Sequence, residues 1–150
     1  MEEILQTNQE ILDAIPHREP FLFVDEIVRC DESGILCKKT FTGREFFYQG
    51  HYPDYPITPG VLLCEAAMQA GAIFLSRFLN TSGGRESDVP VVGRMNEVKF
   101  KQIVRPGEEI QMHVTLKDRM KDVFFMSAKV TVREKTAVTF EFAAKKTPRI

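Results

Sequence analysis

One long apolar segment in the middle of the chain limits the folds that this sequence can adopt. Residues 59–79 (PGVLLCEAAMQAGAIFLSRFL) follow a favourable helix start, with Thr58 as the predicted N-cap and Pro59 at the first helical position. The predicted helix is apolar on nearly every side, so it has to be buried inside the protein. Glu65 and three further polar residues interrupt the segment, and we therefore expect that it does not span a membrane.

The patterns on both sides of this helix are those of strands and turns. Before the helix, residues 8–15 form a short amphipathic helix, and residues 21–30 and 35–41 are β-rich runs that make a hairpin. After a polar connector at residues 80–88, the stretches with strand patterns are 89–104, 110–116, 124–132 and 138–144. Tight turns between strands indicate an antiparallel meander. One helix with about five or six strands predicts a single α+β domain over residues 1–150, with the sheet covering the helix.

Composition argues against several classes of function. The chain has 20 Lys and Arg against 21 Asp and Glu, a net charge of −1, which gives no electrostatic basis for binding nucleic acid or an anionic membrane. The start MEEILQTNQE lacks the basic and then apolar order of a secretory signal, so we expect a cytoplasmic protein. The odd number of cysteines (Cys30, Cys37 and Cys64) indicates free thiols. No recognised metal-ligand spacing occurs, and we expect neither a metal nor a cofactor.

Two titratable residues near the start of the long helix define a candidate site. Glu65 lies on the apolar helix, and His51 precedes it by fourteen residues in a proline-rich loop. Burial raises the pKa of a carboxyl group, so Glu65 can keep its proton near neutral pH, while a loop histidine has an intrinsic pKa suited to a base. The amides of Gly60 and Val61 lie at the positive end of the helix dipole. These groups suit proton abstraction beside a carbonyl, with loss of a β-hydroxyl group as water.

Each residue also has a non-catalytic interpretation. A histidine in a loop is commonly structural, and a glutamate on an apolar helix is commonly paired with an arginine, for which Arg94 is available. Gln69 follows Glu65 by one helical turn and is expected to hydrogen-bond across a helix or subunit contact. His17 has no apolar setting and no partner that the sequence identifies.

A resemblance to a known family decides between these interpretations. It is carried by three stretches, IPHREPFLFVDEI (15–27), FFYQGHYPDYPITPGVLLCEAAMQAG (46–71) and VKFKQIVRPGEEI (98–110). Together, and in this order, they resemble the β-hydroxyacyl-[acyl carrier protein] dehydratases of bacterial type II fatty-acid synthesis. The resemblance implies a hotdog fold, an antiparallel sheet wrapped around one long central helix. It also implies a homodimer with a continuous sheet, and dimers of this family often assemble into a hexamer.

The resemblance further implies roles for the site residues. The active site would lie at the dimer interface, with His51 from one chain and Glu65 from the other. His51 would remove the α-proton of a (3R)-hydroxyacyl thioester, and Glu65 would help the hydroxyl group leave, giving the trans-2-enoyl thioester. The amide of Gly60, next to that of Val61, would hold the thioester carbonyl. Glutamate rather than aspartate on the helix matches the plain dehydratases better than the branch that also isomerises the double bond.

The acyl carrier protein is acidic in the systems of this family, so a basic docking surface is expected near the opening of the site. Lys99 and Lys101 share a predicted strand face, and Arg105 lies beyond them. Alternating lysines are also typical of an ordinary solvated strand face or a protected sheet edge.

Two other functions are compatible with the same fold. A hotdog thioesterase hydrolyses acyl thioesters with a helix carboxylate and an activated water, and fold alone cannot separate it from a dehydratase. That hydrolysis does not need His51. A non-catalytic acyl-binding or scaffold subunit predicts replacement of His51 or Glu65, and both residues are present. The sequence therefore favours the dehydratase, then the thioesterase, then the scaffold.

Overall fold

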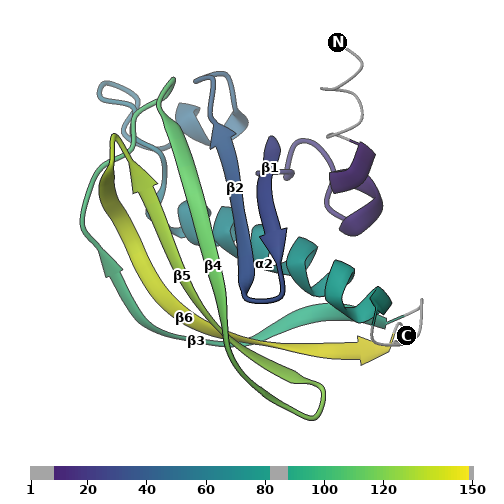
Figure 1. Ribbon diagram of the computed structural model, residues 1–150. Coiled ribbons are helices and arrows are strands. Elements are labelled where there is room, and N and C mark those ends of the chain that lie inside the picture. Colours follow the sequence, from purple (N-terminus) through teal and green to yellow (C-terminus); the bar gives the residue numbers. More distant parts are fainter. Residues whose placement is uncertain (1–8, 82–87, 149–150) are drawn as a thin grey trace.

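A six-stranded antiparallel sheet curves around one long helix (Figure 1). The computed structural model describes residues 9–81 and 88–148, so most of the predicted 80–88 connector lies outside the described residues. The sheet order is β1-β2-β4-β5-β6-β3. The strands are β1 (Glu26–Asp31), β2 (Gly34–Thr40), β3 (Asp88–Phe100), β4 (Glu109–Met120), β5 (Val123–Val132) and β6 (Lys135–Pro148). The helical elements are residues 9–14, the 3-10 turn η1 (Phe46–Gln49) and the long helix α2 (Gly60–Thr81). The predicted α+β hotdog arrangement is confirmed.

The helix α2 is buried because the concave face of the sheet covers it. Its inward side chains are almost inaccessible to solvent, and they pack against alternate residues of the strands, chiefly Met112, Val114, Met126, Phe140 and Phe142. The closest approach is at Gly71, where an added Cβ would lie 2.9 Å from the ring of Phe142. A glycine is therefore needed there for the helix to lie this close to the sheet.

The apolar character of α2 follows from this burial. By length and composition the segment Gly60–Phe78 could cross a membrane, so the sequence-based argument that it is too polar to do so was wrong. More than half of the segment is buried inside the protein, however, and a helix that is apolar all round is the normal core element of a sheet that wraps it.

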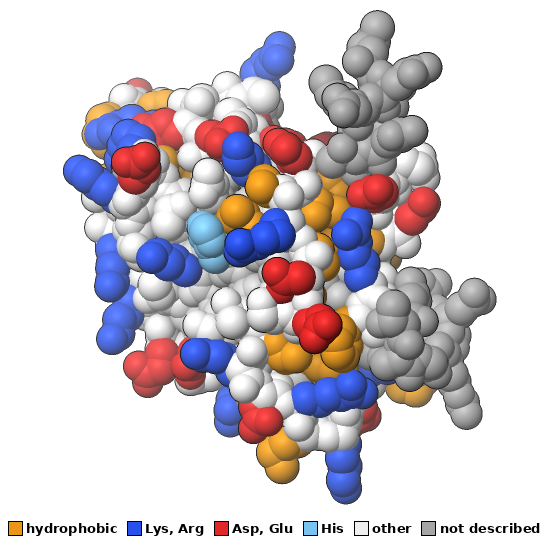
Figure 2. Space-filling model, in the orientation of Figure 1, with side chains coloured by type: hydrophobic (Ala, Val, Ile, Leu, Met, Phe, Trp, Pro, Cys, Tyr) orange, Lys and Arg blue, Asp and Glu red, His pale blue; other side chains and the backbone are white. Residues whose placement is uncertain are grey.

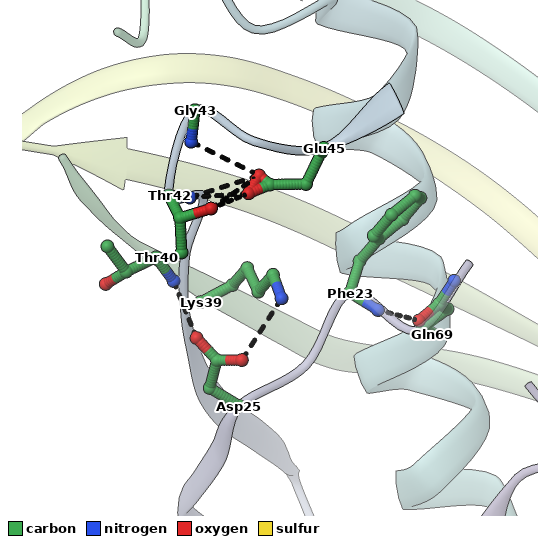
Figure 3. Close-up of polar contacts among 8 residues, drawn as sticks. All are labelled: Phe23, Asp25, Lys39, Thr40, Thr42, Gly43, Glu45 and Gln69. Atoms are coloured by element: carbon green, nitrogen blue, oxygen red, sulfur yellow. Dashed lines mark hydrogen bonds and ion pairs between the residues drawn. The ribbon is translucent and has the colours of Figure 1, made fainter. Parts of the chain in front are cut away.

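The first strand is shorter than predicted because side chains bind the backbone that precedes it. Residues 15–25, here called the strap, run beside α2 outside the sheet until Asp25, whose amide donates to the carbonyl of Lys38 in β2 (2.8 Å). Gln69 of α2 donates from Nε2 to the carbonyl of Phe21 (2.9 Å), and its Oε1 accepts from the amide of Phe23 (2.7 Å; Figure 3). Gln69 was expected to bond across a helix or subunit contact. That expectation was wrong, since its partners are backbone groups of its own chain.

The strap is also fixed at its two ends. Near its start, the guanidinium of Arg18 donates to the carbonyls of Leu12 (2.9 Å) and Ile15 (2.8 Å). At its far end, the carboxylate of Asp25 accepts from Lys39 Nζ (3.1 Å) and from the amide of Thr40 (2.8 Å), which ties it to β2 (Figure 3). The strap therefore passes over the helix face that carries Glu65 and Gln69 in a defined position.

Two later boundaries also differ from the prediction. β4 continues to Met120 instead of turning at residue 117, and the turn into β5 is reduced to residues 121–122. β3 ends at Phe100, after which the amides of Lys101 and Gln102 both donate to the carbonyl of Ala137. Side-chain alternation could not locate these two ends. In β4 the ladder hydrogen bonds continue through polar residues after Leu116, and in β3 they stop at Phe100 although apolar residues follow at 103–104.

Candidate active site

The loop before α2 holds His51 in one orientation. His51 Nδ1 lies 2.9 Å from the carbonyl oxygen of Ile57. A carbonyl oxygen only accepts, so Nδ1 carries the proton and Nε2 of the neutral ring is left with a free lone pair. The ring packs edge-on against Tyr52, with centroids 4.9 Å apart. This tautomer is the one that a general base requires.

The start of α2 leaves two amide groups available. Thr58 was the predicted N-cap, but α2 begins at Gly60, and the Thr58 hydroxyl bonds to the Tyr48 hydroxyl at 2.6 Å. The first intrahelical bonds are instead accepted by the carbonyl of Pro59. Within residues 9–81 and 88–148 no acceptor faces the amides of Gly60 and Val61. Two backbone donors at the positive end of a helix dipole can therefore hold a partial negative charge.

His51 and these amides line the same cavity. Its volume is about 410 Å³, and the other lining residues are mainly apolar: Ile57, Thr58, Pro59, Leu63, Phe100, Gln102 and Ile103. A Cβ at Gly60 would lie 2.6 Å from the Phe100 ring, so the glycine lets that ring cover the helix start. A mostly apolar cavity with one histidine and two amide donors suits an acyl group whose carbonyl is to be polarised.

Glu65 is not among the residues that line this cavity. Burial raises the pKa of Glu65, and the neighbouring Gln69 amide offsets part of that rise. Arg94, the partner that the sequence offered, forms no ion pair with it in the described part of the chain. The facing group is instead His17, whose Nε2 lies 3.9 Å from Glu65 Oε1. The sequence interpretation that His17 lacks a partner was therefore wrong. No local signal could have found this contact, since the strap crosses α2 only in the folded chain.

Two of the three predicted docking residues lie beside the His51 cavity. Lys101 and Arg105 line a neighbouring cavity of about 450 Å³, which shares Phe100, Gln102 and Ile103 with the first. Lys101 lies just past the end of β3, so it does not share a strand with Lys99 as predicted. Arg133, which no sequence pattern singled out, also lines this second cavity and pairs with Glu108.

Charge elsewhere on the surface is mixed. Figure 2 shows Lys and Arg side chains interspersed with Asp and Glu on the face that it presents. Among the described residues no three His, Cys, Asp or Glu side chains gather in a way that could hold a metal ion.

Cys37 and Cys64 are not candidate nucleophiles. Cys37 and Cys64 are buried, and burial raises the pKa of these thiols to about 12 and about 11. A nucleophilic cysteine needs the thiolate form, which such pKa values exclude at neutral pH.

Comparison with known proteins adds to this geometry. Residues 15–141 match the model of a family described as the FabA-like domain. The chain is 39% identical over 132 residues to a 3-hydroxyacyl-[acyl-carrier-protein] dehydratase FabZ of Clostridium perfringens, covering 88% of this chain and 92% of the relative.

Two solved structures share the fold at low identity. The dehydratase heterocomplex ApeI:P of Xenorhabdus doucetiae superposes with a TM-score of 0.79 at 12% identity, over 93% of this chain and 91% of that one. A hypothetical thioesterase with coenzyme A from Streptococcus pneumoniae gives a TM-score of 0.62 at 10% identity, over 97% and 98% of the two chains. Proteins with different named activities therefore have this fold, and the fold alone does not decide between them.

Proposed function

This chain belongs to the FabA-like family, and from that membership we propose that it dehydrates (3R)-hydroxyacyl thioesters on acyl carrier protein, with His51 as base and Glu65 as acid. The activity is that of a 3-hydroxyacyl-[acyl-carrier-protein] dehydratase, a hydro-lyase of fatty-acid biosynthesis, and we place it in the cytoplasm. The observation that carries the assignment of roles is the position of His51. The ring, whose Nε2 is free, lines an apolar cavity that Gly60 and Val61, with their unpaired amides, also line.

In the proposed reaction the thioester carbonyl accepts hydrogen bonds from the helix-start amides. This polarises the carbonyl and makes the α-proton more acidic. His51 Nε2 takes that proton, a double bond forms between the α- and β-carbons, and the bond from the β-carbon to the hydroxyl oxygen breaks. Glu65 gives its proton to the departing hydroxyl group, which leaves as water. The imidazolium and the carboxylate exchange the remaining proton through solvent before the next turnover.

We further propose that the Glu65 of each site comes from a second copy of the chain. Within one chain Glu65 does not line the cavity that contains His51. Among the described strands the edge strand β3 bonds only to β6, and it exposes several apolar side chains, among them Val91, Val92, Met95 and Val98. An unpaired edge with exposed apolar residues is a surface on which a second sheet edge can add. Pairing there would give a homodimer with a continuous sheet, which could assemble further into a hexamer.

Mixing two inactive variants tests this sharing. His51→Ala and Glu65→Gln are each expected to be inactive, but a mixed dimer carries one site with an intact His51 and an intact Glu65. After denaturation and refolding of an equal mixture, we expect recovery of roughly a quarter of the wild-type rate, because half of the dimers are mixed and each has one intact site of two. Refolded single variants are the controls. No recovery from a refolded dimeric mixture would place both residues in one chain.

The product separates the dehydratase from the thioesterase. With a 3-hydroxyacyl thioester as substrate, dehydration yields an enoyl thioester, which absorbs in the ultraviolet, and releases no thiol. Hydrolysis releases free thiol, which a thiol reagent detects, and forms no enoyl product. Thiol release at the rate of substrate loss would overturn the proposed function.

Charge reversal tests the docking surface. Lys101→Glu with Arg105→Glu is expected to raise the KM for carrier-bound substrate by about threefold to tenfold, since cationic side chains at an interface rim speed association with an acidic partner. The kcat for a short thioester without the carrier should not change. Lys117→Glu is the matched control, because Lys117 lies near the end of β4 that is farther along the chain from Arg105. An unchanged KM for the carrier-bound substrate would place docking elsewhere.

A further inference from the structure

The strap brings a second histidine to Glu65. His17 Nε2 lies 3.9 Å from Glu65 Oε1, and both side chains are largely buried, with 28% and 22% of their surface exposed. The strap is anchored on both sides of His17. Arg18, the next residue, bonds to the carbonyl of Ile15. Gln69, one helical turn after Glu65, bonds to the backbone of Phe21 and Phe23, four and six residues after His17. The imidazole and the carboxyl group are thus held opposite each other by bonds on both sides of the contact.

The two nitrogens of His17 have different surroundings. Nδ1 is buried, and among the described residues it has no hydrogen-bond partner. An N–H group at that position would be a buried donor without an acceptor, which is costly. The proton of a neutral ring is therefore favoured on Nε2, which faces the carboxyl group of Glu65.

The groups around His17 also keep the ring neutral. Burial lowers the pKa of His17, and the positive charge of Arg18 lowers it further. Apart from Glu65, Arg18 is the charged group that faces His17 within the described chain. A second proton would have to sit on Nδ1, which is buried and has no partner among the described residues. The burial of Nδ1 and the charge of Arg18 therefore both favour the neutral ring.

We infer that His17 is a positioning residue for Glu65: the 3.9 Å separation closes to a hydrogen bond when substrate binds, Nε2–H then donates to Oε1, and the acidic proton resides on Oε2 and faces the substrate. This inference rests on the proposed function, in which Glu65 is the acid. A carboxylic acid can carry its proton on either oxygen, and only one of these arrangements aims the proton at the leaving hydroxyl group. A donor on one oxygen selects the productive arrangement.

The tautomer of His17 can be measured directly. The chain has three histidines, so ¹⁵N-histidine labelling gives three pairs of imidazole nitrogen signals, which His17→Gln, His51→Gln and His113→Gln variants assign. At neutral pH we expect His17 as a neutral ring with the proton on Nε2. A proton on Nδ1, or a doubly protonated ring, would overturn the inference. This measurement does not depend on catalysis, so its outcome is separate from that of the proposed function.

Kinetics test the role itself. His17→Leu removes the donor and is expected to lower kcat by about 10- to 100-fold with KM changed less than about twofold. His17→Gln keeps an N–H donor at similar reach and is expected to retain most of the activity, whereas His17→Asn, whose amide is shorter, should resemble leucine. His113→Leu, on the outer face of the sheet, is the control. The glutamine and asparagine variants keep the test valid if the leucine variant does not fold.

The outcomes are distinguishable. Equal losses in the glutamine and leucine variants, or full activity in the leucine variant, would leave His17 a packing residue only. A wild-type protein that releases thiol or forms no enoyl product would instead refute the proposed function, whatever the tautomer.

Discussion

Replacing His51 with alanine is expected to lower kcat by a factor of about 10²–10⁴, the usual contribution of a positioned general base. The structure gives the reason: the Ile57 carbonyl fixes the proton on Nδ1 and leaves Nε2 free in the cavity. Melting temperature and oligomer size should stay close to the wild-type values, because the His51 ring is only partly buried and its hydrogen bond is to a loop carbonyl. The measurement is the ultraviolet absorbance change during hydration of an enoyl thioester.

His113→Ala is the matched control for this prediction, since His113 lies on the outer side of β4. It is expected to leave kcat unchanged. Glu65→Gln should reproduce the loss seen with His51→Ala.

In the wild type kcat should fall as the pH rises through the pKa of Glu65. Because burial raises the pKa of Glu65, its acid form persists to higher pH, and kcat should fall at a pH above the ordinary pKa of a glutamate. A His51→Ala protein with full activity would remove the base from the mechanism.

The largest effect on stability is expected at Gln69. Its side chain is 1% exposed and satisfies one amide and one carbonyl of the strap. Gln69→Leu fills similar volume but leaves both backbone groups without partners, and we expect a loss of about 2–5 kcal/mol in the free energy of unfolding. Urea denaturation of wild type and variant measures this difference.

A second glutamine serves as the control. Gln111→Leu, on the outer face of β4, is expected to change the free energy of unfolding by less than about 0.5 kcal/mol. If Gln69→Leu were as stable as Gln111→Leu, the strap would not depend on its bonds to α2. Where the variant still folds, a mobile strap should also reduce turnover, because His17 would lose its position beside Glu65.

The helix and most strands could be predicted from sequence because each depends on local pattern. Residues 59–79 are apolar all round, and the alternation in residues 110–116 gives a buried face that the structure reproduces. The candidate residues of the helix start were also recognisable, since Gly60 and His51 lie in the stretch 46–71 that carries the family resemblance. The strap could not be recognised from the sequence, because residues 21–25 have the composition of a strand. Gln69, a residue 46 positions after Phe23, binds the backbone of Phe21 and Phe23 in place of a neighbouring strand.

The contact between His17 and Glu65 could not be predicted for the same reason. It depends on how the strap crosses α2, and no spacing in the sequence records that crossing. The place of Arg133 beside Arg105 likewise follows from the turn between β5 and β6 coming next to the loop after β3.

The position of β3 in the sheet has a consequence for the order of folding. β3 follows α2 in the chain, but its ladder partner is β6, with Asp88 opposite Pro148. During synthesis β3 emerges before the strand that fixes its register, and pairings this distant in sequence form late. The proposed dimer edge is therefore shaped only after β4, β5 and β6 have joined the sheet. In the proposed dimer, a second chain can therefore add at this edge only after the first chain has folded.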